Sequence, residues 1–479
     1  MAKKKFYITT TAPYVNSKPH LGFALEIVQA DAIARYHTLL GEDVFFNFGT
    51  DEHGKKIYQK AVGEKKDPQK YTDEYAAKFD GLKVALNLSY NNFTRTTDPH
   101  HKKAAQEIWK RCLDNGYIQK GVYKAKYCIG CELEKQDSDL ENGKCPIHPN
   151  LEIELIEEEN YFFKFSKFED KLLTLYKNYS DFVIPKHRLK EITNFVGSGL
   201  EDFSISRLKE KMPWGVAVPG DNKHVMFVWF DALTYYISAL GWPEDAEKFE
   251  EYWGTTDHPK ALQVAGKDNL RQQSAMWQAM LMAADLPPSR QIFIHGFITS
   301  GGEKMSKSLG NVIDPIEYIE KYGTDALRYY LLAKISPTED SGFTKEKFEE
   351  VYNADLANGL GNLVARVAKL CEKVGVGKIK SAPVNDPTVQ KAIEGFEFDK
   401  TMLNIWSQIK TTDQLINNEE PWKIEEEEKL KERLETYSEN ILNIAYNLKP
   451  FLPETAEKIE KQFKGPKIKS APPLFPRIT

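Results

Sequence analysis

The chain has 479 residues, of which 41% are hydrophobic, so it is long enough for more than one core and is expected to form two to four domains. Its formal charge of −5 argues against a protein that binds nucleic acid over its whole surface, so any contact with RNA must come from local patches. No apolar run reaches membrane-spanning length, and the basic start at residues 1–5 is followed by too short and polar a stretch for a secretion signal. We therefore expect a cytoplasmic protein whose five cysteines are reduced or bound to metal.

The N-terminal region predicts a strand, a helix and a second strand. Residues 6–10 read as a strand, a helix begins near His20 and ends at Gly41, and residues 44–48 read as the next strand, followed by a loop at 49–54. A strand–helix–strand unit of about forty residues predicts a parallel sheet. Loops that follow such strands are where α/β sheets bind ligands.

The middle of the chain changes character twice. Helical patterns run from 67 to 115, and short β-like runs with four potential metal ligands fill 117–168, which predicts an insertion. After Gly199 the parallel-sheet pattern returns. The expected elements there are a strand at 225–229, a helix from about Asp231, a strand at 262–264, a helix at 269–284 and a last strand at 292–294.

The C-terminal region is expected to be all helical. Beyond Asp314 no strand pattern is found, and residues 345–463 read as helices with loops at Pro383 and Pro421. Residues 464–469 and the proline-containing end read as a tail.

Segment 301–311, with the sequence GGEKMSKSLGN, is predicted as a loop because glycines bracket it. Its two lysines and two serines follow a predicted strand, and such a set suits a polyphosphate that gains charge during a reaction. A solvated turn is the alternative, and the loop alone separates the two only weakly.

The turn Pro19–Gly22 lies where a strand is followed by a helix. Free N–H groups and the helix dipole favour an anion there, and the imidazole of His20 can donate to a phosphate oxygen. Taken by itself, this pattern is more often an ordinary helix start with a surface histidine.

Four residues have the spacing of a zinc knuckle: Cys128, Cys131, Cys145 and His148. Three thiolates and one imidazole can surround one tetrahedral ion, and four protein ligands leave no open position, so the ion would be structural. Two unrelated thiol pairs are the alternative. Cys112 and Cys371 lie on helical patterns and are expected to be core thiols.

Asp268 and Asp51 each follow a predicted strand. The carboxylate of Asp268 could hold ribose hydroxyls, and either aspartate could instead cap a helix. Aromatic residues near these turns could line an apolar pocket, although aromatics more often belong to the plain core.

These segments resemble the class I aminoacyl-tRNA synthetases. HLGF at 20–23 together with KMSKS at 304–308 is similar to the two signatures of that class. Further segments are similar to methionyl-tRNA synthetases in particular: Pro13–Asn16, Gly49–Gly54, Glu159–Phe163 and Trp229–Ala232. The resemblance extends from Tyr7 to about Trp422, with the segments in the family's order.

The resemblance implies a reaction in which ATP and methionine give methionyl-adenylate and pyrophosphate. The methionyl group then passes to tRNA(Met), including the initiator tRNA. Catalysis would consist of positioning and electrostatic stabilisation, without a covalent enzyme intermediate. Lys307 would stabilise charge on the pyrophosphate, supported by Lys304, with His20 on the phosphates. Mg²⁺ would accompany ATP.

The resemblance also implies the residues of each subsite. The ATP-binding residues would be His20, Gly22, Asp268, His295, Gly296, Met305 and Lys307. Asp51 would face the methionine ammonium group and pair with Arg207. The other methionine-binding residues would be Thr11, Ala12, Tyr14, Phe203, Trp229, Ala232, Leu233, Tyr236, Asn269 and Gln273.

By the same resemblance the chain has a Rossmann-type parallel-sheet nucleotide-binding domain with a zinc-knuckle insertion, followed by an all-α anticodon-binding bundle. Asn362, Arg366 and Trp422 match the positions that read the CAU anticodon, by stacking and by bonds to base edges. The implied domains are two halves of the catalytic domain at 1–116 and 199–298, the insertion at 117–198, the KMSKS loop and stem-contact region at 299–344, and the anticodon-binding domain at 345–479.

Three positions depart from the family pattern. Phe23 replaces the second histidine of the first signature, Gln273 replaces a histidine near the methionine pocket, and Asn269 replaces an apolar residue there. The chain also ends where some relatives append a dimerisation domain, so a monomer is expected.

Two rival functions follow from these observations. A synthetase for valine, leucine or cysteine is disfavoured by the aromatic pocket and by the short insertion, since the valine and leucine enzymes carry a much larger one. A paralogue that binds tRNA but activates no amino acid is kept open by Phe23 and Gln273. ATP–pyrophosphate exchange with each amino acid would separate these readings.

Overall fold

The computed structural model of the chain describes residues 3–131, 133–300, 303–305, 311–379 and 383–478. The chain divides into two compact units, one formed by 1–18, 43–81 and 90–294, and the other by 19–42, 82–89 and 295–479. We call them unit 1 and unit 2 and describe each by itself. None of the helices in the described ranges is long and apolar enough to cross a membrane.

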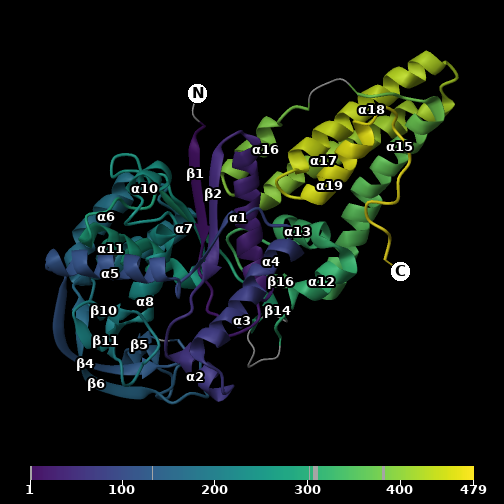
Figure 1. Cartoon of the computed structure of the whole chain (residues 1–479). Coiled ribbons are helices and arrows are strands. Elements are labelled where there is room, and N and C mark those ends of the chain that lie inside the picture. Colours follow the sequence, from purple (N-terminus) through teal and green to yellow (C-terminus); the bar gives the residue numbers. More distant parts are fainter. Residues whose placement is uncertain (1–2, 132, 301–302, 306–310, 380–382, 479) are drawn as a thin grey trace. The chain divides into compact units, whose positions relative to one another are not determined.

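Unit 1 is built on a six-stranded sheet of order β3-β2-β1-β12-β13-β7 (Figure 1). The neighbours β3, β2, β1 and β12 run parallel, as do β13 and β7. The bounds are β1 Lys5–Thr10, β2 Asp43–Thr50, β3 Asn92–Arg95, β7 Val183–Ile184, β12 Leu262–Gly266 and β13 Gln291–His295. Ile8 pairs with Phe46 on one side and with Leu262 on the other, and all three are buried, as expected of a sheet covered on both faces. The predicted parallel sheet is confirmed.

Two antiparallel sheets complete the strands of unit 1. One has the order β5-β4-β6-β8, from β4 Ile118–Cys128, β5 Leu133–Lys135, β6 Glu154–Phe163 and β8 Phe203–Ser204. The other is β10-β11-β9, from β9 Ser206–Leu208, β10 Ala217–Val218 and β11 Asp221–Met226. The turn between β5 and β6 holds the remaining part of the predicted zinc knuckle.

Most helices of unit 1 pack on one large apolar core, to which α2 and α3 contribute no residue. The helices of unit 1 are α2 Lys55–Gly63, α3 Pro68–Asp80, α5 Pro99–Asp114, α6 Glu169–Asn178, α7 Lys186–Gly197, α8 Val228–Ala232, α9 Tyr235–Ser238, α10 Ala246–Trp253 and α11 Trp277–Ala283, with a π-helix at Gln272–Met276 before α11 and 3-10 turns at Asp137–Asp139, Phe165–Phe168 and Lys267–Asn269. The aromatic side chains Trp109, Trp253 and Trp277 are fully buried in this core.

Unit 2 contains the signature helix, a small sheet and a helical bundle. Its first helices are α1 Leu21–Leu39, which links β1 to β2 along the chain, and α4 Leu82–Ala85. The sheet has the order β15-β14-β16, from β14 Ile298–Ser300, β15 Glu303–Lys304 and β16 Ser341–Phe343. The remaining helices are α12 Pro315–Tyr322, α13 Thr324–Ala333, α14 Lys345–Val351, α15 Asn362–Val374, α16 Pro387–Glu394, α17 Phe398–Glu419, α18 Glu427–Leu448 and α19 Pro453–Phe463, with a π-helix at Tyr352–Gly361 and a 3-10 turn at Pro421–Lys423. Helix α18 packs against α15, α17 and α19 (Figure 1).

The expected strand at 225–229 is wrong in its second half. Strand β11 ends at Met226 and lies in an antiparallel sheet, and Trp229 lies in α8, which begins at Val228 rather than at Asp231. Residues 225–228 are all buried, and periodicity cannot separate a buried strand from a buried helix.

Other strands escaped the sequence pattern because they are short. The four residues of β3 lie inside the region expected to be helical, and β14, β15 and β16 follow the strand expected to be the last. Residue pair Glu303–Lys304 belongs to β15, within the expected loop. Strands of two to four residues carry too few side chains for a period of two to be recognised.

Candidate functional site

The first signature is placed by the start of α1 in unit 2. His20 is the N-cap residue, and its Nδ1 accepts a hydrogen bond of 3.0 Å from the backbone N–H of Gly22. Neutral imidazole has one donor and one acceptor nitrogen, so this bond assigns the proton to Nε2 and makes that atom the donor. A Cβ at Gly22 would lie 2.8 Å from His20 Cε1, so only glycine leaves the ring in this position.

Phe23 packs against the ring of His20, with 4.5 Å between ring centroids. The residue that replaces the family's second histidine therefore supports the first one by an apolar contact.

The second signature segment begins next to this turn. Met305 is buried, and a Cβ built on Gly22 would lie 3.9 Å from Met305 Cε. The backbone N–H of Leu21 donates to the carbonyl of Ile313, beyond the lysine-rich segment, over 3.0 Å. Met305 of the second signature thus lies beside the His20–Gly22 turn in unit 2. Lys304 lies in β15, and Lys307 is outside the described residues.

His295 is held by both ring nitrogens. Nε2 lies 2.9 Å from the Glu26 carboxylate on α1, and Nδ1 lies 2.7 Å from the carbonyl oxygen of Gly296. A Cβ at Gly296 would fall 2.3 Å from the backbone of Glu339, so this position also requires glycine. These contacts fix the orientation of the His295 ring.

In unit 1 the loop that carries Asp51 is tied to the turn after β1. Tyr14 and Asp51 form a parallel bridge, the N–H of Asp51 donates to Pro13, and the N–H of Val15 donates to Asp51. The Tyr14 ring meets that of Trp229 edge to face at 6.3 Å. Asp51 caps no helix, since the N-cap of α2 is Gly54, so the capping alternative does not hold. The pairing of Asp51 with Arg207 stays a prediction.

The Asp51 loop is fixed on its two sides by buried polar groups that sequence reasoning missed. Glu52 is fully buried and accepts from Arg95 Nε and Nη2 at 2.6 and 2.8 Å. His53 Nδ1 lies 2.6 Å from Asp231 Oδ2, and His101 Nε2 lies 2.8 Å from Asp231 Oδ1. Asp231 follows Trp229 on α8, so this His53–Asp231–His101 clamp joins the Asp51 loop to the Trp229 helix.

Burial opposes ionisation of Asp231, but the charge and hydrogen bonds of His53 and His101 outweigh it and hold the pKa of that carboxyl well below its ordinary value. The carboxylate form is therefore the one that accepts both hydrogen bonds. The sequence motifs did not predict the contact of these three side chains, because the residues are far apart in the sequence.

The side-chain amide of Gln273 is hydrogen-bonded within the predicted methionine site. The Gln273 side chain donates to the Tyr236 hydroxyl and accepts from Gln263 Nε2 at 3.0 Å. Both Gln273 and Tyr236 are buried. The departure at position 273 thus keeps a hydrogen-bonding residue whose partner is a predicted pocket residue.

The other predicted ligand-binding residues of unit 1 differ in burial. Ala232, Leu233 and Arg207 are buried, whereas Thr11, Ala12 and Phe203 are half-buried. Asp268 is exposed in the 3-10 turn after β12, without capping it, and its carboxylate accepts from Asn269 Nδ2 at 3.3 Å.

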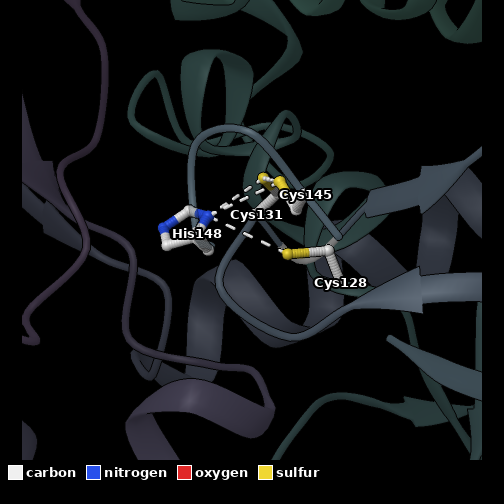
Figure 2. A group of neighbouring side chains, drawn as sticks. All are labelled: Cys128, Cys131, Cys145 and His148. Carbon is white, nitrogen blue, oxygen red and sulfur yellow. Dashed lines mark hydrogen bonds between the residues drawn. The ribbon is translucent and has the colours of Figure 1, made fainter. Parts of the chain in front are cut away.

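The four predicted metal ligands come together (Figure 2). Nδ1 of His148 lies 3.3, 3.8 and 4.0 Å from the sulfurs of Cys131, Cys128 and Cys145, and the sulfurs of Cys131 and Cys145 are 3.5 Å apart. A tetrahedral zinc ion with bonds of about 2.3 Å to sulfur and about 2.0 Å to nitrogen would separate its ligand atoms by about 3.5–3.8 Å. The arrangement therefore fits a zinc-sized ion.

The backbone of the knuckle is shaped for this cluster. A Cβ at Gly130 would lie 2.4 Å from the His148 ring, so only glycine fits between the two cysteines at that point. Ile129 packs against the cluster of Tyr127, Phe227 and Val228, on which Tyr14 and Trp229 also pack. The cluster of Cys128, Cys131, Cys145 and His148 could hold a metal, and the knuckle supports two predicted pocket aromatics. Cys112 and Cys371 are buried core thiols, as expected.

The predicted anticodon residues lie on the bundle of unit 2. The Arg366 guanidinium donates to Asp413 and Asn417 at 3.1 and 2.8 Å, and it sits 5.0 Å from the centre of the Trp422 ring. Trp422 is 52% exposed, so it is no core aromatic. Arg366 and Trp422 line a hollow of 430 Å³, and Asn362 is exposed one turn before Arg366 on α15.

Comparison with known proteins gives the same family at sequence and structure level. A family model described as tRNA synthetases class I (M) matches residues 6–150 and 130–368. The methionine–tRNA ligase of Nostoc sp. is 39% identical over 480 residues, which cover 96% of this chain and 90% of the relative. That of Brucella suis biovar 1 is 37% identical, with coverage of 100% and 98%.

Among solved structures, Mycobacterium tuberculosis methionyl-tRNA synthetase in complex with methionyl-adenylate matches with a TM-score of 0.90 at 32% identity, covering 99% of this chain and 100% of that one. This chain belongs to the family of class I tRNA synthetases that contains the methionine–tRNA ligases.

Proposed function

We propose that this chain is a methionine–tRNA ligase. It activates methionine with ATP to methionyl-adenylate, releases diphosphate, and transfers the methionyl group to tRNA(Met), including the initiator tRNA. The observation that carries the proposal is the His20–Gly22 turn lying against Met305, because it joins the two segments that the phosphate chemistry needs. The choice of methionine as the amino acid is supported by relatives that are named methionine–tRNA ligase and match nearly the full chain.

The phosphate groups are assigned to the start of α1 and to the lysine-rich segment. His20 donates from Nε2 to a phosphate oxygen, since Nδ1 is occupied by Gly22. Lys307, with Lys304 in support, meets the charge that develops on the leaving diphosphate. Mg²⁺ binds with the ATP phosphates and neutralises part of that charge.

The remaining ATP contacts are assigned to two separate strand ends. Asp268 accepts hydrogen bonds from the ribose hydroxyls, and its orientation is supported by Asn269. His295, Gly296 and Met305 flank the adenine, and the fixed ring nitrogens of His295 support a stacking or backbone role there.

Methionine is assigned to unit 1. Asp51 attracts the ammonium group, while Tyr14, Trp229 and Tyr236 surround the thioether, whose contacts with aromatic edges contribute about 0.3–1.5 kcal/mol each. The other contacts come from Thr11, Ala12, Phe203, Arg207, Ala232, Leu233, Asn269 and Gln273. The bond between Gln273 and Tyr236 supports an intact pocket despite the departure from the family pattern.

The ion of the knuckle is assigned as one structural Zn²⁺, held by three cysteines and one histidine. Its role follows from the packing of Ile129 beneath the Phe227–Trp229 segment. A bound zinc would fix that segment and would take no part in the reaction.

The bundle at 345–479 is assigned to anticodon binding, with the catalytic halves, the insertion and the stem-contact region at the boundaries predicted from the sequence. The exposed Trp422 ring stacks on a base, and Asn362 and Arg366 bond base edges, as single-stranded RNA is read. We further propose that the protein is a cytoplasmic monomer.

The test is methionine-dependent ATP–diphosphate exchange, followed by charging of tRNA(Met). The wild type should exchange with methionine and fail with valine, leucine and cysteine. Lys307→Ala should slow exchange by about 10²–10³, which corresponds to about 3–4 kcal/mol, with little change in methionine affinity. Binding of tRNA(Met) without any exchange would establish the paralogue instead.

A further inference from the structure

The C-terminal segment that the sequence predicts as a tail is held against the bundle. We call residues 465–478 the C-terminal strap. Lys467 forms an antiparallel bridge with Gly377, the N–H of Ile468 donates to Val376, and Ile468 is buried. Farther on, Phe475 is buried against Tyr352 with ring centroids 6.0 Å apart. Figure 1 shows this yellow segment running beside α15.

The strap and α19 enclose a hollow of 830 Å³ that is lined by four lysines. Lys458 and Lys461 lie one turn apart on α19, so they share a face of that helix. Lys467 and Lys469 are two positions apart on the extended strap, so their side chains lie on the same side of it. Two short rows of positive charge therefore border the hollow, which we call the lysine groove.

These lysines carry little countercharge, and the exception is the Glu372 carboxylate, whose charge interacts with that of Lys469. All four are exposed, and within the described ranges none of them forms an ion pair. The nearby Glu460 is occupied elsewhere, by Lys449 at 3.0 Å and Lys464 at 2.6 Å. A chain with a net charge of −5 thus concentrates four lysines without an ion pair in one hollow, and such a field attracts a polyanion.

The lysine groove continues into the hollow that contains Trp422. The N–H of Ser470, which lines the groove, donates to Glu372 at 3.3 Å, and Glu372 lines the Trp422 hollow. That hollow adds Arg366, Lys369 and Lys373 from α15. Along both hollows Glu372 is the one carboxylate among the described lining residues, and the strap already holds it.

We infer that the lysine groove binds the phosphate backbone of the tRNA strand that adjoins the anticodon. The inference rests on the proposed function, which puts the anticodon bases at Trp422 and Arg366. A strand that leaves this point meets the groove next, and a cationic groove that follows the backbone is how sequence-independent RNA contacts are made. The bases supply specificity, and the groove supplies affinity and register.

The experiment measures binding of the full-length protein to a fluorescent anticodon stem-loop RNA of tRNA(Met) over a range of KCl concentrations. The variant Lys461→Gln/Lys467→Gln/Lys469→Gln should weaken binding about tenfold to a hundredfold and reduce the slope of log Kd against log salt by about two to three, since each phosphate contact contributes about 0.7–0.9. The corresponding Lys→Arg triple variant should retain the wild-type slope, because the charges remain.

The matched control is Lys345→Gln/Lys347→Gln/Lys391→Gln, three exposed lysines of unit 2 outside both hollows, and it should bind like the wild type. A wild-type slope in the groove variant would overturn the inference, and so would an equal loss of binding to an acceptor-stem minihelix without an anticodon. Methionine-dependent exchange by the wild type tests the proposed function separately. A failure of the proposed function can therefore be distinguished from a failure of the groove inference.

Discussion

Replacing Asp231 should loosen the Asp51 loop and the Trp229 helix together. Its carboxylate is fully buried and accepts from His53 at 2.6 Å and from His101 at 2.8 Å. Asp231→Asn keeps the shape of the side chain but removes its charge. The asparagine has one acceptor oxygen, whereas the carboxylate uses two oxygens to accept the hydrogen bonds of His53 and His101. Asp231→Ala leaves both buried ring nitrogens without this partner.

The magnitudes follow from these contacts. A hydrogen bond to a charged group contributes about 1.5–3 kcal/mol and a neutral one about 0.5–1.5, so Asp231→Asn should cost about 2 kcal/mol in the free energy of unfolding. Asp231→Ala removes two hydrogen bonds to a charged group, each worth about 1.5–3 kcal/mol, so it should cost about 4 kcal/mol. Because whole domains are stable by only about 5–15 kcal/mol, the asparagine variant, with its smaller cost, is the one expected to stay folded during purification.

The assay is hydrogen exchange of peptides that cover 50–54 and 228–232, combined with the KM for methionine in the exchange reaction. Both peptides should lose protection together in Asp231→Asn, and KM should rise about tenfold while kcat changes less, as expected for lost ground-state positioning. The control is Asp181→Asn, whose carboxylate pairs with Arg290 at 2.6 Å but is 47% exposed, and which should cost less than about 1 kcal/mol. Wild-type protection and KM in Asp231→Asn, or an equal cost in the control, would refute the clamp.

Gly22→Ala should displace the His20 ring and slow methionine activation about tenfold to a hundredfold, whereas Gly63→Ala, with open space at its Cβ, should leave the rate unchanged. Purified protein should contain one zinc per chain, and Cys145→Ser should lower both the zinc content by mass spectrometry and the melting temperature. Trp422→Ala should raise the KM for tRNA about tenfold or more, and Trp422→Phe should restore most of it by stacking. Burial opposes ionisation of Asp31, but Arg328, Arg35 and Ser89 outweigh it and hold its pKa below the ordinary value. Its contribution to stability is therefore complete above about pH 4 and is lost as the pH falls further, so acid unfolding curves of Asp31→Asn should be shallower in that range than those of the wild type.

The parallel sheet and the bundle were predictable because their strands contain continuous apolar runs and their helices are long. Helix α1 spans 19 residues, strands β1 and β2 are six- and eight-residue segments with continuous buried runs, and the Cys128–His148 spacing suits the geometry of one ion. Strand β3 and the start of α8 were not predictable in the same way. The first is short, and the second lies in a continuous apolar run, so neither shows a period that decides its type.

Side-chain partners were the least predictable feature. The residue types at 53, 101 and 231 are visible in the sequence, but their contact depends on three separate elements meeting in the folded unit. Likewise, the aromatic at 422 could be expected in a core until its exposure was known. A contact between residues that are close in the sequence, such as the hydrogen bond from Gly22 to His20, can be predicted from their spacing. A contact between residues that are far apart in the sequence cannot.

Three segments that carry proposed chemistry have a fully buried carboxylate beside them, bound by basic side chains. Helix α1 carries His20 and is joined by Asp31 to the buried Arg328 of α13 at 2.7 Å, the Asp51 loop is joined by Glu52 to Arg95 at 2.6 Å, and the Trp229 helix is joined by Asp231 to two histidines. Apolar replacements of similar volume could stabilise such positions equally well. They would not fix direction, because apolar contacts tolerate sliding and rotation that two charge-assisted hydrogen bonds do not. Since misplacement by about 1 Å can cost about 10²-fold in rate, these buried pairs are best explained as the elements that hold turns and short helices in register for catalysis.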